Sequence, residues 1–299
     1  MIFNESLQIA ISNLGWIDKG TLWVYNGVEQ QHSSIKISDA KHLTLTEGID
    51  GYFSIVHHYE DSKIAISVHH FKKPKKEYCK IYFDNFKTSF TGDISFSQFI
   101  PKYYICAFAL ADDREFHLIK IKANMICLED EKIEWFKNGA FDFGYQGLTS
   151  VTEFSNELIF TVQRDSFLYR YSLNDGKIIA KVTLAGKRGN PEPVIINNSI
   201  WVADYDTLIR LENWEVKQAI KLQDEAEGCS QFIGKFSFNA ENDWCIVARP
   251  FSGDVIGLNK YFKIDYQCKT GSQPIEAVLL KNGLVIARDW QTGMLVKGK

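Results

Sequence analysis

The segment from Gly147 to Gln223 contains the same pattern of short apolar runs twice. Residues 147–184 and residues 192–222 each hold four runs of strand-forming residues, and polar turns separate the runs. Alternating apolar and polar residues indicate a half-buried β-strand, whereas an amphipathic helix needs a period near 3.6 residues. The doubled pattern therefore predicts successive four-stranded units rather than helices.

Comparable units recur along the whole chain. The second run of each unit ends at a polar turn, at Asn26, His58, Asp112, Arg164, Asp204, Arg249 and Arg288. Self-similarity at about 40 to 50 residues, with four strands per period, is typical of a β-propeller. We expect an all-β fold with a single β-propeller domain over residues 1–299. Seven four-stranded blades fit the pattern, and six blades are the alternative.

The two ends of the chain bear on how such a propeller closes. The last unit, after residue 275, holds three runs and stops one strand short of the others. We expect an N-terminal strand to complete it, because a blade shared by both ends leaves no open sheet edge. Residues 128–140 are open to a second interpretation, since they could form a short helix instead of a strand.

Composition excludes several classes of partner. The formal net charge of −3 gives no general attraction to nucleic acids or to anionic membranes. No run of 18 apolar residues is present, and the N-terminus lacks a basic segment followed by an apolar core. We therefore expect a cytoplasmic protein with no nucleic-acid or membrane partner.

The six cysteines are scattered, and no two have the spacing of a zinc site. Without a secretion signal, buried reduced thiols are the expected state. The doublets His57-His58 and His69-His70 are the other metal-ligand candidates. Strand geometry places the doublets about 15 Å apart along a hairpin and sends the members of each doublet to opposite faces. We expect ordinary strand histidines and no metal.

A short motif near the C-terminus resembles a known superfamily. Residues 287–293, ARDWQTG, resemble the A-x-D-x-x-T-G segment of quinoprotein-like β-propellers, with Ala287, Asp289, Thr292 and Gly293 matching. Residues 172–177, SLNDGK, are similar to a turn of the same superfamily with one residue deleted. The resemblance implies a propeller of the quinoprotein-like or WD-repeat-like type. The tryptophan that normally ends the segment is missing, which argues against pyrroloquinoline quinone, so we expect no cofactor.

No linear motif indicates catalysis. The sequence lacks a G-x-S-x-G elbow, a P-loop and a G-x-G-x-x-G segment. The basic cluster at residues 71–76 falls between two strands and has no aromatic interleaving, so a solvated loop explains it. The tryptophans Trp16, Trp23, Trp201, Trp214 and Trp244 are expected to pack between blades.

Charged residues at the ends of the second runs are the best candidates for a binding site. They occupy comparable positions in successive units, so in a propeller the turns that follow them would emerge on one face. The alternative is that hairpin turns are simply polar. The candidate binding residues are Arg164, Asp165, Asp204, Asp206, Arg249, Arg288, Asp289 and Trp290.

These observations favour a non-catalytic scaffold that holds a protein partner on this face, either as a complex subunit or as a protein that neutralises its partner. The alternative is an enzyme or binder that acts on a sugar or small polar metabolite at the central channel of the propeller. Under the first hypothesis, charge reversal at Arg249 and Arg288 would weaken partner capture without affecting folding.

Overall fold

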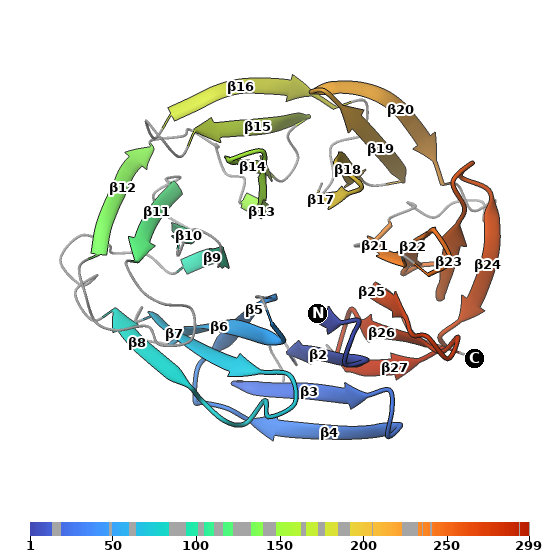
Figure 1. Cartoon of the computed structure of the whole chain (residues 1–299), viewed down its shortest axis with the longest axis horizontal. Coiled ribbons are helices and arrows are strands. Elements are labelled where there is room, and N and C mark those ends of the chain that lie inside the picture. Colours follow the sequence, from blue (N-terminus) through green and yellow to red (C-terminus); the bar gives the residue numbers. More distant parts are fainter. Residues whose placement is uncertain are drawn as a thin grey trace. The chain divides into compact units, whose positions relative to one another are not determined.

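The described part of the chain folds into strands and turns, as a computed structural model shows (Figure 1). The chain divides into two compact units, Met1–Gly147 with Thr292–Met294 (unit 1) and Leu148–Gln291 with Leu295–Lys299 (unit 2). The structure describes residues 1–13, 19–47, 50–59, 64–83, 94–100, 105–110, 116–121, 133–139, 148–162, 166–172, 177–184, 192–204, 206–222, 233–234, 236–239, 241–292 and 294–298.

The sheets of unit 1 are antiparallel, and their strands follow one another in chain order. The first sheet contains β1 (Ile2–Asn4), β2 (Ile9–Asn13), β3 (Thr21–Asn26) and β4 (Gln31–Lys36). The second contains β5 (His42–Glu47), β6 (Tyr52–His58), β7 (Ile64–His70) and β8 (Cys79–Phe83). The third contains β9 (Ile94–Ile100), β10 (Ile105–Leu110), β11 (Phe116–Ile121) and β12 (Ile133–Gly139).

Unit 2 repeats this arrangement. Its sheets comprise β13 (Leu148–Phe154), β14 (Glu157–Val162), β15 (Phe167–Ser172) and β16 (Lys177–Thr183), then β17 (Glu192–Ile196), β18 (Ser199–Asp204), β19 (Thr207–Glu212) and β20 (Glu215–Lys221). Next come β21 (Phe236–Asn239), β22 (Trp244–Arg249), β23 (Asp254–Leu258) and β24 (Ile264–Lys269). The last sheet contains β25 (Pro274–Leu279), β26 (Val285–Asp289) and β27 (Leu295–Lys297).

Two-residue turns between strands follow from the sequence. Asn197 and Asn198, between β17 and β18, have φ angles of 47° and 60°. A type I′ hairpin turn requires both central residues in this left-handed region, which asparagine tolerates better than most residues. Asn213 and Trp214 adopt the same region between β19 and β20, with φ angles of 51° and 66°. Trp214 is the unusual member, because a bulky side chain rarely has a positive φ.

The expectation of seven four-stranded blades is wrong. Among the described residues, six sheets have four strands and the C-terminal sheet has three. Six is also the number of blades in the alternative. Closure by an N-terminal strand is also wrong, because β1 pairs with β2 through Ile2↔Ile11 and Asn4↔Ile9. The reason is local: the Leu7 N–H donates to Asn4 Oδ1 at 2.9 Å, and this tight turn returns the chain directly from β1 to β2.

The segment that was open to a helical interpretation contains a strand. Residues Ile133–Gly139 form β12 and pair with β11, while residues 128–132 and 140 lie outside the described residues. Nowhere in the described ranges is there a helix with the length and apolar character needed to cross a membrane.

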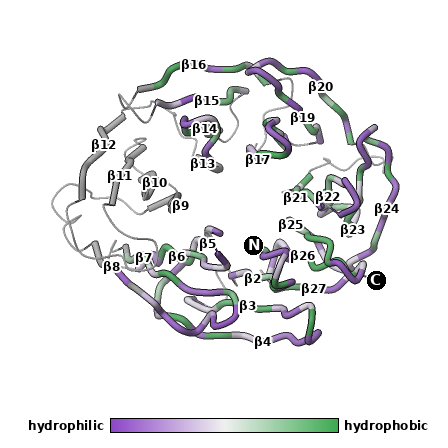
Figure 2. The backbone as a smooth tube through the Cα atoms, viewed as in Figure 1, coloured by the Kyte–Doolittle hydropathy of each residue, from purple (hydrophilic) through white to green (hydrophobic). Residues whose placement is uncertain are grey.

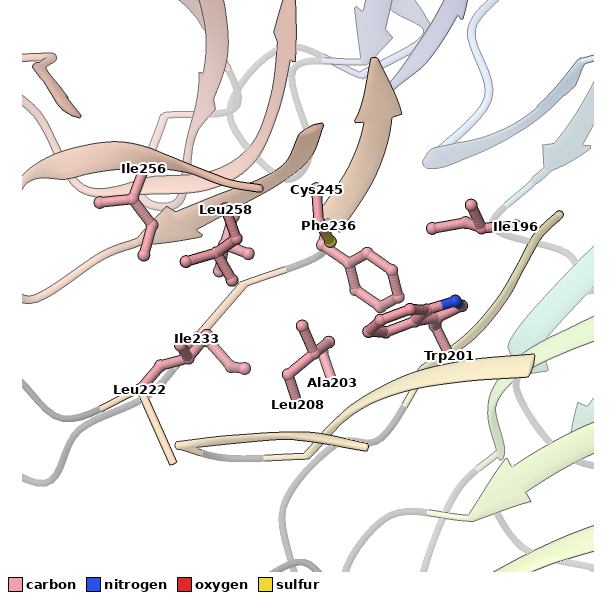
Figure 3. Packing of buried hydrophobic residues seen from close by; sticks show 11 residues of the cluster. Ile196, Trp201, Ala203, Leu208, Leu222, Ile233, Phe236, Cys245, Ile256 and Leu258 are labelled. Carbon is pink, nitrogen blue, oxygen red and sulfur yellow. The ribbon is translucent and has the colours of Figure 1, made fainter. Parts of the chain in front are cut away.

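The core of unit 2 lies between neighbouring sheets. Trp201 on β18 packs against Phe236 on β21, with ring centroids 6.3 Å apart, and Figure 3 shows both within one apolar cluster. Trp214 reaches from its turn to Phe154 at the end of β13, at a centroid distance of 5.5 Å. The expectation that Trp201 and Trp214 pack between blades is therefore confirmed. The edge strands β20 and β24 carry exposed polar side chains among apolar ones (Figure 2).

Candidate functional site

The predicted binding residues of unit 2 lie at turns between the second and third strands of neighbouring sheets. These turns follow β18, β22 and β26. In an antiparallel sheet, such a turn lies at the opposite end from the turns that follow the first and third strands. We call Asp204, Asp206 and residues 249–254 and 289–291 the hairpin face.

Arg249 closes its own hairpin. Its Nε and Nη2 donate to the two carboxylate oxygens of Asp254 at 2.8 and 2.7 Å, and Arg249 and Asp254 are directly opposite on β22 and β23. Both residues are buried. Burial alone would raise the pKa of the Asp254 carboxyl, but hydrogen bonds from Arg249 and Gln267, with the charges of Arg249 and Lys269, lower that pKa below its ordinary value. Arg249 and Asp254 thus form a bidentate salt bridge within the sheet.

Arg288 and Asp289 are also held within one sheet. Arg288 Nε donates to Glu276 Oε2 at 3.0 Å, across the β25–β26 pair. The Asp289 carboxylate accepts the backbone N–H groups of Gln273 and Gln291, each at 3.1 Å. These bonds shape the turn after β26, so the two side chains hold the backbone in place.

Asp204 and Asp206 are buried at the turn after β18, with exposed fractions of 0% and 2%. The Thr207 hydroxyl donates to Asp206 Oδ1 at 3.0 Å, and Lys221 Nζ lies 3.8 Å from Asp206 Oδ2. Arg164 and Asp165 lie outside the described residues. Arg249, Arg288, Asp289 and Asp206 thus make contacts within their own sheets, and Asp204 is buried.

The hairpin face presents two aromatic rings instead. Phe251 and Trp290 are each 48% exposed, and their rings meet edge to face with centroids 6.0 Å apart. Phe251 belongs to the turn after β22, and Trp290 follows β26 in the next sheet. Trp290 is one of the predicted site residues, whereas Phe251 was missed.

The sequence does contain a signal for Phe251. Residues 248–253 read ARPFSG and residues 287–293 read ARDWQTG, so an aromatic residue follows two positions after the arginine in both. Each arginine is fixed inside its sheet, so the aromatic residue is carried to the exposed tip of the turn. Comparing the two turns would have identified Phe251 as the partner of Trp290.

A second polar cluster lies inside the β5–β8 sheet. The ring of His57 bonds Ser38 Oγ through Nδ1 at 2.9 Å and Ser67 Oγ through Nε2 at 2.6 Å. Ser67 Oγ lies 2.7 Å from His69 Nε2, and His69 Nδ1 lies 2.9 Å from the Pro74 carbonyl oxygen. Four hydrogen bonds thus link five residues in a continuous chain, which is buried at His57, Ser67 and His69.

The direction of this chain follows from its last acceptor. The Pro74 carbonyl can only accept, so His69 carries its proton on Nδ1, and its Nε2 accepts from the Ser67 hydroxyl. Ser67 then accepts from His57 Nε2–H, and His57 Nδ1 accepts from Ser38. Both rings are neutral in this arrangement. Burial, with a contribution from the charge of Lys80, lowers the pKa of His57 to about 3.

The estimate of about 15 Å between the histidine doublets overstated their separation. His57 pairs with Ala65, and Ser67 and His69 follow Ala65 on the same face of β7. Because both rings reach toward Ser67 between them, one hydroxyl bridges the two Nε2 atoms. Among the described residues, no three His, Cys, Asp or Glu side chains are grouped as a metal site requires.

Successive sheets of antiparallel strands in chain order define the class of protein. The chain has a β-propeller fold similar to WD40 and quinoprotein-like propellers. No protein-family profile matches the chain, and no curated protein matches its sequence.

Solved structures of the same fold include propeller domains of larger proteins and a gluconolactonase. The β-propeller domain of Cps50 (Swd1) from Myceliophteria thermophila matches with a TM-score of 0.69 and 11% identity, over 99% of this chain and 94% of that chain. The periplasmic gluconolactonase PpgL of Pseudomonas aeruginosa matches with a TM-score of 0.64 and 11% identity, over 97% and 95%. The WD40 propeller domain of Doa1 matches with a TM-score of 0.60 and 10% identity, over 96% and 87%. The fold hosts different functions, so function must be argued from the site.

Proposed function

We propose that this protein is a non-catalytic scaffold that binds a protein partner on the hairpin face through Phe251 and Trp290. The observation that carries the proposal is the exposed edge-to-face contact between these two rings. Each ring comes from a different sheet, and an ion pair, buried for Arg249 and partly buried for Arg288, fixes the turn or strand beside it. A rigid pair of exposed aromatic side chains is typical of the centre of a protein interface.

The surroundings of the two rings indicate the chemistry of the partner. The side chain of Lys269, 67% exposed, lies beside the turn that carries Phe251, where its Nζ contacts the Ser252 carbonyl at 3.1 Å. Gln273 and Gln291 are joined by an amide hydrogen bond of 3.0 Å beside Trp290. An apolar side chain of the partner would cover the rings, and polar or acidic groups around it would meet the amides and Lys269. A complex subunit or a protein that is neutralised by binding would both fit.

The proposal includes two further statements about the whole chain. Both units belong to one propeller domain over residues 1–299, in line with the single propeller domains that match nearly all of the chain. The protein acts in the cytoplasm, where its buried thiols suit a reducing compartment. Cys245 and Cys268 are both buried thiols outside any disulfide, and burial raises the pKa of the Cys245 thiol to about 12.

Affinity purification from the native cell tests the proposed face. The wild-type protein and a Phe251→Ala/Trp290→Ala variant are compared by mass spectrometry of the captured proteins. Truncation of a central aromatic side chain in an interface costs about 2 kcal/mol or more, which is about 30-fold in Kd. We expect the partner to be captured by the wild type and lost from the variant.

Tyr261→Ala is the matched control. Tyr261 is 71% exposed and lies in the turn after β23, at the opposite end of the same sheet. Its removal should leave capture unchanged. Equal capture by the wild type and the double variant would overturn the proposed face, as would equal losses from the double variant and the control.

The structure also changes the expectation for charge reversal. Replacing Arg249 by an acidic residue would place a second negative charge beside the buried Asp254. A buried carboxylate that loses its partner destabilises the fold strongly. Charge reversal at Arg249 and Arg288 is therefore a test of folding, and the aromatic substitutions are the test of binding.

A further inference from the structure

A cavity of about 200 Å³ lies between the sheets β17–β20 and β21–β24. Its walls include the aromatic side chains of Trp201, Phe238 and Phe262. The rim includes turn residues at the end of these sheets opposite to the hairpin face. The cavity is thus separate from the site proposed above, and its occupancy does not depend on the partner proposed there.

The preceding pair of sheets shows how such a space can be filled from within. On β14 and β15, Ile159 is opposite Arg170, and Glu157 precedes Ile159 by two residues. Arg170 Nε and Nη2 donate to the two oxygens of Glu157, each at 2.7 Å. The guanidinium also lies 3.6 Å from the centre of the Trp214 ring, which comes from the next sheet. The Glu157 carboxylate, the Arg170 guanidinium and the Trp214 indole thus pack against one another in a single layer.

Arg210 occupies the equivalent position one sheet later. Trp201 is opposite Arg210 on β18 and β19, as Ile159 is opposite Arg170, and Ser199 precedes Trp201 by two residues. Ser199 therefore stands where Glu157 stands in the other sheet, and its side chain is too short to replace the carboxylate. Both Ser199 and Arg210 line the cavity.

The carboxylate of this layer comes from the opposite strand, β19, instead: Glu212 stands where Ser172 stands in the preceding sheet, and it contacts Arg210 through Nη2. Arg210 Nη2 lies 2.7 Å from Glu212 Oε1, two residues further along β19. Arg210 Nε is buried and has no hydrogen-bond partner within the described part of the chain. A buried donor without an acceptor is costly, and native proteins satisfy nearly all of them with protein, water or ligand atoms.

The aromatic cover also differs between the two layers. Phe262 takes the role of Trp214: both have a positive φ, at 60° and 66°, in the turn between the third and fourth strands of the following sheet. Phe262 rests on Trp201 with ring centroids 5.1 Å apart, whereas Trp214 lies directly over Arg170. Ser199 and Phe262 are each smaller than Glu157 and Trp214, whereas Trp201, whose ring centre lies 5.8 Å from the Arg210 guanidinium, is larger than Ile159. The space that remains beside Arg210 is part of the cavity.

We propose that this cavity binds a small aromatic carboxylic acid, whose carboxylate takes the place that Glu157 fills in the preceding sheet. The carboxylate accepts from Arg210 Nε and from the Ser199 hydroxyl. The aromatic ring of the ligand packs against Trp201, Phe238 and Phe262 in place of the larger cover that Trp214 provides.

Size and charge agree with this class of ligand. A cavity of about 150 Å³ holds a benzene ring, so about 200 Å³ suits one ring with a carboxylate. Lys260 lies at the rim and attracts an anion, while Asp243, also at the rim, opposes one. The Cys245 thiol in the wall stays neutral, because burial raises its pKa to about 12. Selectivity for a carboxylate therefore depends on Arg210.

Isothermal titration calorimetry with sodium phenylacetate tests the proposal on the full chain. Phenylacetamide, which has the same shape and no charge, is the matched ligand. We expect saturable one-to-one binding of phenylacetate and at least tenfold weaker binding of the amide, because a charge-assisted hydrogen bond is about twice as strong as a neutral one.

Two variants locate the site. Ser199→Glu supplies the carboxylate from the chain itself, so it should weaken phenylacetate binding at least tenfold without lowering the melting temperature. Arg210→Gln should weaken binding of the acid and leave binding of the amide unchanged. Glu157→Gln alters the equivalent pair in the neighbouring layer and is the control, with wild-type affinity expected.

The comparison of acid and amide on the wild type decides the proposal even if a variant does not fold. Absence of saturable binding at millimolar phenylacetate overturns it, and so does equal affinity for the acid and the amide. Full affinity in a folded Ser199→Glu variant would show that the acid binds elsewhere and would also overturn it.

Discussion

The buried histidines of the β5–β8 sheet should make the protein lose stability as the pH falls from 7 to 5. His57 and His58 are 0% and 7% exposed, and burial is the main cause that lowers the pKa of each from 6.5 to about 3. Because these folded-state pKa values lie below 6.5, the unfolded chain takes up protons first. The stabilising effect of the neutral rings is complete above pH 6.5 and decreases as the pH falls toward 3.

The size of the effect follows from proton linkage. Between pH 7 and pH 5, a histidine whose pKa falls from 6.5 to about 3 on folding costs about 2 kcal/mol of unfolding free energy. His57 and His58 together give about 4 kcal/mol. His69 adds to this loss, since burial lowers its pKa as well. Total stability of a domain is about 5–15 kcal/mol, so the change is easily measured.

Urea unfolding monitored by tryptophan fluorescence at pH 7 and pH 5 measures the loss. His57→Gln removes one titrating ring, so its unfolding free energy should change with pH by about 2 kcal/mol less than that of the wild type. His32 is exposed on β4, and His32→Gln should keep the wild-type pH dependence. Nitrogen NMR would in addition find the protons on His57 Nε2 and His69 Nδ1.

Equal stability of the wild type at pH 7 and pH 5 would refute the reasoning. A His57→Gln variant with the full wild-type pH dependence would refute the role of this ring. If the variant does not fold, the NMR titration of the wild type decides, because a His57 ring that titrates near 6.5 contradicts its buried neutral state.

Two further predictions concern stability. Arg249→Met should lower the unfolding free energy in urea by about 3 kcal/mol, because it leaves the buried Asp254 carboxylate without its bidentate partner. The double variant Arg249→Met/Asp254→Leu should recover most of this loss. A loss below about 1 kcal/mol in the single variant would contradict a stabilising role of the Arg249–Asp254 salt bridge. Gly20→Ala should destabilise the protein more than Gly283→Ala. Both glycines have a positive φ, but a Cβ at Gly20 would clash with the Ser38 carbonyl oxygen, whereas a Cβ at Gly283 meets nothing within 4 Å. Equal melting temperatures of the two alanine variants would show that this contact does not matter.

The strands of unit 2 could be predicted because local chemistry determines them. Asn197 and Asn198 favour a type I′ turn, and the alternation in β20 matches its alternate burial. The frame of the first sheet could not be predicted, because β1 has three residues and too few to show a period. The blade count therefore depended on a strand that pattern reasoning cannot detect.

The positions of the candidate residues in the fold could be predicted, but their contacts could not. Position along the chain correctly located Arg249 and Trp290 at turns after second strands. The sequence does not show that Asp254 lies directly opposite Arg249, so a structural ion pair resembled a binding residue. The cavity beside Arg210 was beyond sequence reasoning, because the correspondence between Ser199 and Glu157 depends on strand register.

The fixed direction of the Ser38–His57–Ser67–His69 chain limits how protons can travel through it. Its last acceptor is the amide oxygen of Pro74, which binds a proton far more weakly than an imidazole nitrogen. A proton that entered at Ser38 could not leave at the other end of the chain. Reversing the direction of the hydrogen bonds would require a donor in the place of the Pro74 carbonyl oxygen. The chain therefore orients dipoles and holds β6, β7 and the 71–76 loop together, and its Ser67 hydroxyl proton should exchange with solvent slowly.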